Sequence, residues 1–119
     1  MYGINEVLER LRAISYPSSR VKIVPGFIEN TISLVDLPDK VCFAYVDFDF
    51  YEPILIALNY LNEHLSMGGC MVVDDYGVFS SGAGAAVDEF LAAHPSQYDF
   101  VLPHKSAVHV VILSKIAHS

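Results

Sequence analysis

Apolar residues recur along this chain at the spacing of helices in two places. Near the start they lie three or four positions apart, at Ile4, Val7, Leu8, Leu11 and Ile14. This period places them on one face of a helix that Pro17 ends. The same pattern returns in the middle, at Ile54, Leu55, Leu58, Leu61 and Leu65. It predicts a helix that starts near Pro53 and ends at the turn formed by Gly68 and Gly69.

Shorter, continuous apolar runs bounded by turn residues predict the strands of a sheet. They cover residues 21–24, 41–47, 70–74, 98–102 and 108–113. Two further segments predict helices, a short one or a turn within 28–37 and a longer one over 85–93. Strands and helices alternate through the middle, which favours parallel pairing, whereas the last two strands are too close in sequence for a crossover helix. The expected fold class is α/β, a mostly parallel sheet with an antiparallel final strand and helices on both faces.

Acidic residues end two of these predicted strands. Asp47 and Asp49 follow the first central strand, and Asp74 and Asp75 end the second. The carboxyl ends of parallel strands meet at one edge of a sheet, where open α/β folds hold their ligands. Crowded carboxylates repel each other unless a cation or a proton joins them, and oxygen ligands suit Mg²⁺. The pattern predicts a metal site formed by Asp47, Asp74 and Asp75.

Composition and charge narrow the possible partners. The chain has 119 residues, enough for one domain with a hydrophobic core, and a net charge of −7 with only seven basic residues. Nucleic acids and anionic membranes attract clustered lysine and arginine, which this sequence lacks. It has neither a signal-peptide pattern at its start nor an apolar run of roughly 20 residues. We expect a cytoplasmic protein that binds neither nucleic acid nor membranes.

Four segments carry a more specific resemblance. They are residues 45–52 (YVDFDFYE), 65–69 (LSMGG), 72–77 (VVDDYG) and 86–90 (AVDEF). In order and spacing they resemble the class I S-adenosylmethionine-dependent methyltransferases. The resemblance is strongest to the macrocin O-methyltransferase family, which methylates sugar hydroxyls on macrolide antibiotics. It implies a Rossmann-like methyltransferase sheet.

The resemblance also implies a function for the acidic residues. In that family Mg²⁺ would be held by the positions that match Asp47, Asp74 and Asp75. The metal would orient and acidify an acceptor hydroxyl for attack on the sulfonium methyl group, which makes Asp47 the candidate catalytic residue. Asp49 matches the second acid of the motif, and Phe48 stands where relatives often carry glycine. The implied cofactors are S-adenosylmethionine and Mg²⁺, and the implied partner is a small molecule with a hydroxyl.

One part of the family pattern is not found. Such enzymes bind their cofactor through a glycine-rich loop after the first strand and an acidic residue at the end of the second, and nothing before Val21 matches either. We therefore expect residues 1–119 to form a single, incomplete methyltransferase domain without the first cofactor-binding strands, and no cofactor-binding residue is identified. The strand at 21–24 would then pair with residues 41–47 or with another copy. An exposed apolar edge favours a homodimer or a larger assembly.

Three alternatives stay open. The first is a non-catalytic or assembly-dependent fragment that keeps the fold without the activity. The second is a Mg²⁺-dependent phosphatase of the haloacid dehalogenase type, since Asp47 and Asp49 match its acid pair, although no lysine lies between Asp47 and Asp74. The third is a receiver domain, in which the acidic pair would precede the single aspartate rather than follow it.

Other residues near the acidic clusters have simpler structural interpretations. Asp49 or Glu52 could cap the following helix. Tyr51 and Tyr76 flank the clusters and either line an acceptor pocket or pack. His109 falls in a predicted strand, where a buried core histidine is a simpler interpretation than a catalytic one. No general base is nominated.

Overall fold

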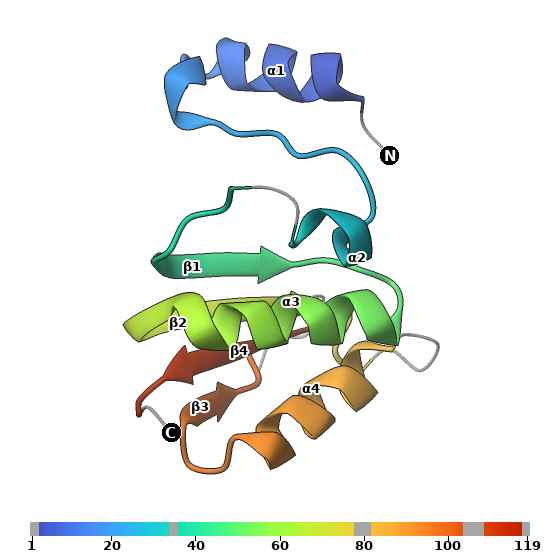
Figure 1. Ribbon diagram of the computed structural model, residues 1–119, viewed down its shortest axis with the longest axis vertical. Coiled ribbons are helices and arrows are strands. Elements are labelled where there is room, and N and C mark those ends of the chain that lie inside the picture. Colours follow the sequence, from blue (N-terminus) through green and yellow to red (C-terminus); the bar gives the residue numbers. More distant parts are fainter. Residues whose placement is uncertain (1–2, 34–35, 78–81, 104–108, 118–119) are drawn as a thin grey trace. The chain divides into compact units, whose positions relative to one another are not determined.

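The computed structural model describes residues 3–33, 36–77, 82–103 and 109–117. It divides the chain into two compact units, Met1–Val35 and Asp36–Ser119, and each is considered by itself. Figure 1 labels the α-helices and the strands of both units. The expectation of one domain over residues 1–119 stays a prediction.

The first unit contains three short helical segments. They are α1 (Ile4–Ala13), the 3₁₀ helix η1 (Ser18–Arg20) and α2 (Ile28–Thr31). The helix predicted from the apolar period at the start of the chain is α1, and α2 is the short helix predicted within 28–37. None of the described residues of this unit is buried. Residues 3–33 therefore build no hydrophobic core of their own.

The strand predicted at residues 21–24 is wrong. Val21 has an extended backbone, with φ −117° and ψ 128°, but no strand is assigned there. A strand is held by hydrogen bonds to a neighbouring strand, and an apolar run alone does not provide them. The four-stranded sheet contains no partner for this segment, and β1 (Val41–Val46) pairs with β2 (Leu65–Asp74) instead.

The second unit is built on a four-stranded sheet in the order β1-β2-β4-β3. Its last two strands are β3 (Tyr98–Val101) and β4 (Val110–Lys115). β1 and β2 are parallel, and β4 runs antiparallel to both of its neighbours, β2 and β3. Three strands therefore point one way and the final strand points the other. This confirms the mostly parallel sheet with an antiparallel final strand.

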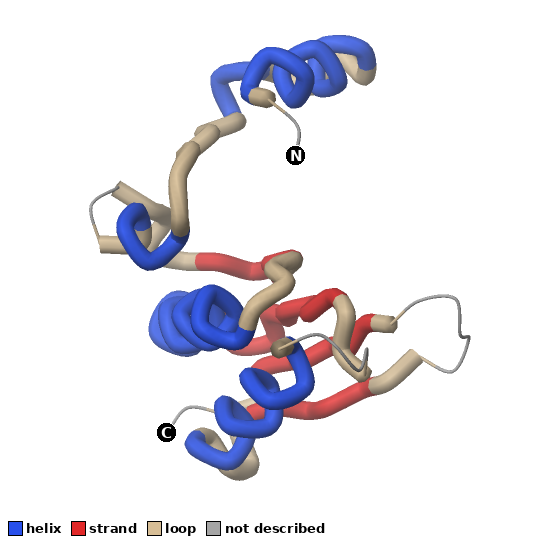
Figure 2. The backbone as a smooth tube through the Cα atoms, turned by 90° about the vertical axis from the view of Figure 1, so that its right-hand side faces the viewer, coloured by secondary structure: helices blue, strands red, loops and turns tan. Residues whose placement is uncertain are grey.

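Two helices and one face of the sheet enclose the core of this unit. The helices α3 (Tyr51–His64) and α4 (Ala83–Ala93) contact each other and lie on the same side of the sheet (Figure 2). The largest fully buried side chains are Phe90, Ile54, Leu58, Met71, Leu113, Val73, Val87 and Val111. Alternate strand residues supply this face, as the pleat requires. The helical layer predicted for the other face has no counterpart among the described residues of this unit.

The end of α3 differs from the prediction. The helix ends at His64 rather than at Gly68 and Gly69, because Leu65 is already extended (φ −72°, ψ 127°) and pairs with Val41. Gly68 instead adopts a positive φ of 79° inside β2, where the register of the β1–β2 pair shifts. The two glycines therefore form an irregularity in the strand, which is a common use of glycine.

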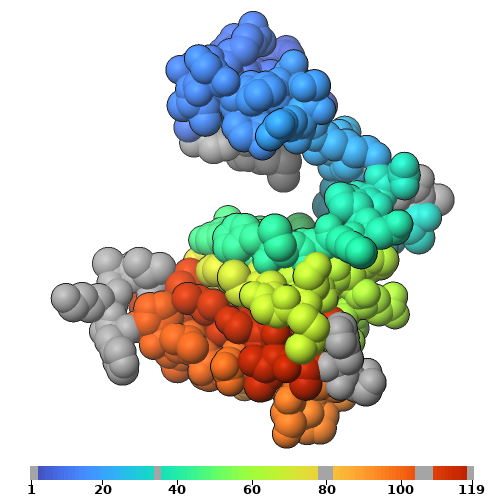
Figure 3. Space-filling view, turned by 90° about the vertical axis from the view of Figure 1, so that its left-hand side faces the viewer, coloured from blue at the N-terminus to red at the C-terminus, as the bar shows by residue number. Residues whose placement is uncertain are grey.

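A buried lysine joins this helix end to the last strand. Lys115 is only 3% exposed, and its Nζ donates hydrogen bonds to the carbonyl oxygens of Asn62, at 2.8 Å, and of Leu65, at 3.0 Å. Figure 3 shows the meeting of these distant segments, with red residues near the end of the chain against yellow-green residues of the α3–β2 region. The ammonium group supplies donors to carbonyls that the helix itself leaves without partners.

No helix among the described segments has the length and apolar character needed to cross a bilayer.

Candidate metal centre

The register of the parallel pair places the two acidic segments side by side. The last pair of residues in the β1–β2 ladder is Val46 and Val73, so Asp47 follows β1 at the level where β2 has Asp74. Both aspartates therefore lie at the carboxyl ends of neighbouring strands. Asp75 comes next in the chain and begins the turn that leaves the sheet.

The three carboxylates that the sequence singled out lie together. Asp47, Asp74 and Asp75 each offer one oxygen, and these oxygens lie within 4.8 Å of one another. Ligand oxygens on opposite sides of one Mg²⁺ ion lie about 4.2 Å apart. The chemistry of the donors thus fits a single hard cation, and the upper limit of their spacing, 4.8 Å, is close to the span of such a ligand sphere. Asp47 is exposed, whereas Asp74 and Asp75 are half-buried.

Backbone geometry sets the direction of the aspartate pair. Asp75 has a positive φ of 61°, a left-handed conformation that aspartate and asparagine tolerate better than most residues. Its backbone N–H donates a hydrogen bond of 2.8 Å to Oδ1 of Asp74. The turn therefore begins with a local bond that fixes one carboxylate against the backbone of the next residue.

The electrostatics of the cluster follow from its crowding. Although Asp47 is exposed, partial desolvation of its carboxyl group raises its pKa, and the carboxylates of Asp74, Asp75 and Asp49 raise it further. Each of these effects disfavours the charged form of Asp47. A divalent cation shared by the cluster would offset the repulsion between the carboxylates and favour the charged form of Asp47.

A tyrosine on β1 contacts the same cluster. The Tyr45 hydroxyl donates a hydrogen bond of 2.8 Å to Oδ2 of Asp74. This bond, then burial and the charges of Asp74, Asp47 and Asp75, raise the pKa of Tyr45 to about 12. The phenol therefore remains protonated, and a donor, throughout the physiological range. Tyr45 opens the segment 45–52 that carries the family resemblance, but no role was predicted for it, although its position two residues before Asp47 places both on one face of the sheet.

The capping interpretation of Asp49 and Glu52 is wrong. The residue that precedes α3 is Phe50, and no side chain caps this helix end. The carbonyl of Asp49 accepts a weak hydrogen bond of 3.4 Å from the N–H of Gly82. Phe48, which stands between Asp47 and Asp49 in the sequence, is half-buried.

Helix α4 is linked to both acidic segments through tyrosines. The Tyr51 hydroxyl donates a hydrogen bond of 2.7 Å to Oε1 of Glu89. The Tyr76 hydroxyl donates one of 2.9 Å to Oδ1 of Asp88. Both tyrosines were predicted to line a pocket or to pack, but their partners could not be predicted, because no local sequence pattern shows that residues 88 and 89 lie beside them.

Gly82 allows a close approach beside the centre. This residue precedes α4, and a Cβ placed on it would lie 2.7 Å from Cα of Tyr51 and would also collide with the Tyr51 backbone nitrogen. No side chain larger than hydrogen fits there without movement. Gly82, the residue before α4, therefore has a packing function.

The described histidines are explained without catalysis. His64 stacks on Tyr60 with ring centroids 4.1 Å apart, in the last turn of α3 where a positive charge suits the helix dipole. His94 follows α4 and packs beside Phe90. His109 is exposed and precedes β4, so the interpretation as a core histidine is wrong. His104 and His118 lie outside the described residues.

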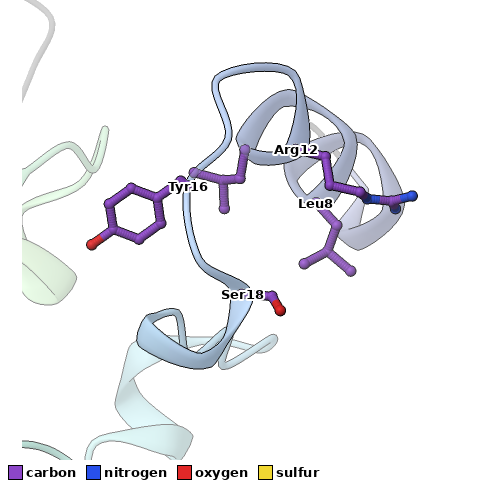
Figure 4. Close-up of a pocket in the computed structure, with 5 residues that line it drawn as sticks. Leu8, Arg12, Tyr16 and Ser18 are labelled. Atoms are coloured by element: carbon purple, nitrogen blue, oxygen red, sulfur yellow. The ribbon is translucent and has the colours of Figure 1, made fainter.

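The first unit contains a separate hollow of about 270 Å³. It is lined by Leu8, Leu11, Arg12, Tyr16 and Ser18, and Figure 4 shows the side chains of α1 and of the segment that follows it around this space. Its lining is mainly apolar and includes no carboxylate. The residues that line it include no carboxylate, imidazole or thiol that would bind a metal.

Comparisons with solved structures support the fold. The O-methyltransferase NovP superposes with a TM-score of 0.84 and 23% identity, over 97% of this chain and 46% of that one. A Clostridium thermocellum protein assigned as an rRNA methylase gives a TM-score of 0.69 and 20% identity, over 98% of this chain and 68% of that one. The methyltransferase fold predicted from the sequence is therefore confirmed, and the chain spans less than half the length of NovP.

Sequence comparison identifies the family. No curated protein matches the chain. The family model of the macrocin-O-methyltransferases (TylF) matches residues 3–104, which include all three clustered aspartates. The predicted resemblance is confirmed, and the chain belongs to the macrocin-O-methyltransferase (TylF) family.

Proposed function

We propose that this chain is the metal-binding and acceptor-binding part of an S-adenosylmethionine-dependent O-methyltransferase. The observation that carries the proposal is the meeting of Asp47, Asp74 and Asp75, whose oxygens lie within 4.8 Å of one another at the tips of parallel strands. Membership of an O-methyltransferase family supports the reaction class. Three clustered carboxylates whose repulsion a cation would relieve support the metal.

Asp47, Asp74 and Asp75 would together hold Mg²⁺, which when bound lowers the pKa of an acceptor hydroxyl and orients it. Asp74 and Asp75 are fixed by the turn that ends β2, so they serve as the anchored ligands. Asp47 is the most exposed of the three and is the one best placed to face the acceptor. It is accordingly the proposed catalytic residue.

S-adenosylmethionine is the methyl donor that the family implies. None of the described residues is assigned to it, and the chain spans 46% of NovP, so cofactor binding is proposed for the enzyme as a whole. The acceptor is proposed to be a hydroxyl of a sugar or another small molecule. The net charge of −7 supports this over an RNA acceptor, despite the likeness to a protein assigned as an rRNA methylase.

Melting experiments test the metal. Mg²⁺ or Mn²⁺ is expected to raise the melting temperature of the chain, since an ion that binds only the folded state stabilises it. The double variant Asp74→Asn with Asp75→Asn should abolish the shift, and asparagine suits the left-handed backbone at position 75. The double variant Glu6→Gln with Glu9→Gln changes the net charge equally on α1 and should keep the shift. An unchanged melting temperature in excess metal would contradict the ligand assignment.

Calorimetry with S-adenosylhomocysteine separates the enzyme from its first alternative. Binding in the micromolar range supports a chain that contributes to cofactor binding. A titration without heat at high protein concentration supports a non-catalytic or assembly-dependent fragment that keeps the fold and the acidic cluster. The phosphatase alternative gains no support from the family match, which is to methyltransferases.

A further inference from the structure

One carboxylate of the cluster is held more firmly than its neighbours. Both oxygens of Asp74 accept a hydrogen bond of 2.8 Å, Oδ1 from the backbone N–H of Asp75 and Oδ2 from the Tyr45 hydroxyl. A carboxylate with a donor on each oxygen cannot rotate without breaking one bond. The plane of the Asp74 carboxylate is therefore fixed from two sides.

The topology explains how Tyr45 reaches this carboxylate. Tyr45 pairs with Val72 across the parallel β1–β2 ladder, and Asp74 lies two residues further along β2 on the same face of the sheet. The long tyrosine side chain spans this diagonal between neighbouring strands. Tyr45 is 54% exposed, so tight packing does not force its hydroxyl into this position.

We infer that Tyr45 is a positioning residue of the metal centre, and that its hydroxyl orients the Asp74 carboxylate for the cation. An ionised carboxylate has about four lone-pair sites, so the two hydrogen bonds leave lone pairs on both oxygens for a metal. Partners that orient a metal ligand in this way typically change metal affinity by about 10- to 100-fold. The inference rests on the proposed function of the cluster.

The chain contains a matched control for this bond. Tyr51 donates a hydrogen bond of the same kind, at 2.7 Å, to a carboxylate oxygen of Glu89. Glu89 is not a member of the carboxylate cluster. Removing the hydroxyl of Tyr51 therefore deletes an equivalent tyrosine–carboxylate bond without freeing any of the three clustered aspartates.

The test is a calorimetric titration of Mn²⁺ into the wild-type chain and the variants Tyr45→Phe, Tyr51→Phe and Asp74→Asn. Tyr45→Phe is expected to weaken the affinity about 10-fold, and Tyr51→Phe should leave it within about twofold of wild type. Melting temperatures without metal should stay close to wild type in Tyr45→Phe, because a half-exposed side chain loses only its hydroxyl. This separates an effect on the ligand from a loss of folding.

The outcomes distinguish the inference from the function on which it rests. Wild-type binding that Asp74→Asn weakens and Tyr45→Phe leaves unchanged would overturn the role of Tyr45 and keep the metal site. An equal loss in Tyr45→Phe and Tyr51→Phe would also overturn it, since the effect would not depend on contact with Asp74. A wild-type chain that takes up no Mn²⁺ would overturn both.

Discussion

At the scale of single residues, the carboxylates at the strand tips are placed at some cost to the folded state. Asp47 is exposed, yet partial desolvation of its carboxyl group and the neighbouring carboxylates of Asp74, Asp75 and Asp49 raise its pKa. The acidic pattern in the sequence was enough to predict this grouping, because alternating strands and helices favour parallel pairing, and parallel strands bring their carboxyl ends to one edge of the sheet. The tyrosine partners could not be predicted, since each depends on a contact across the fold.

The raised pKa of Asp47 has a defined consequence for stability without metal. The folded state holds the proton of the Asp47 carboxyl group more tightly than the unfolded state does. The resulting stabilisation of the folded state is therefore fully present below the ordinary carboxyl pKa and is lost as the pH rises through the raised pKa of Asp47. Asp47→Asn should therefore raise the metal-free melting temperature by about 2 °C at about pH 7. The gain should shrink towards about pH 4. A gain of the same size at both pH values in thermal melts would contradict this cause.

Two nearby glycines should respond in opposite ways to alanine. A Cβ at position 82 would lie 2.7 Å from Cα of Tyr51, whereas a Cβ at position 84 meets no atom within 4 Å. Gly82→Ala is expected to lower the free energy of unfolding by about 2 kcal/mol through overpacking. Gly84→Ala lies within α4 and should raise it by about 0.5 kcal/mol through helix propensity. Urea unfolding measures both, and equal effects would contradict the packing function of Gly82.

At the scale of elements, the sequence located most helices and strands, but it misplaced the end of α3 and predicted one strand that does not form. The apolar period found α1, α3 and α4, because a buried stripe is visible without knowing its partner. The apolar period placed the end of α3 at Gly68 and Gly69, because it does not show that Leu65 pairs with Val41. The strand predicted at 21–24 does not form for a related reason. A strand requires hydrogen bonds to a neighbouring strand, and an apolar run does not show whether that neighbour is present.

The buried lysine at the end of α3 provides a test at this scale. Lys115 donates to the carbonyls of Asn62 and Leu65, and Lys115→Met would leave both without this donor. The expected loss of unfolding free energy is about 2 kcal/mol, the usual cost of buried polar groups without partners. Lys40→Met, at an exposed position, should change it by less than about 0.5 kcal/mol. Chemical denaturation followed by circular dichroism compares them, and similar small effects would contradict the role of Lys115.

At the scale of the whole molecule, the sheet of the second unit ends in a strand with exposed aromatic residues. β1 is a terminal strand, and Phe43 and Tyr45 are 56% and 54% exposed. The sequence predicted an apolar edge but assigned it to residues 21–24, because it could not show which strand would lie last. An unpaired strand of this character is a site for association.

Self-association is the corresponding prediction. Light scattering should report a species larger than the 13.1 kDa chain, with a mass that grows with protein concentration. Phe43→Lys, which places a charge on the terminal strand, should shift the mass towards the monomer. Phe27→Lys makes the same change at an exposed position of the first unit and should have no such effect. A monomer at every concentration would contradict the prediction.

The most direct test counts the ions that the clustered aspartates bind. Electron paramagnetic resonance of a Mn²⁺ titration distinguishes bound from free metal, and one bound ion per chain is expected for the wild type. Asp74→Asn with Asp75→Asn should remove that ion, while Glu6→Gln with Glu9→Gln should retain it. Mn²⁺ that stays free in the wild-type sample, or that binds equally well without the aspartate pair, would contradict the metal centre.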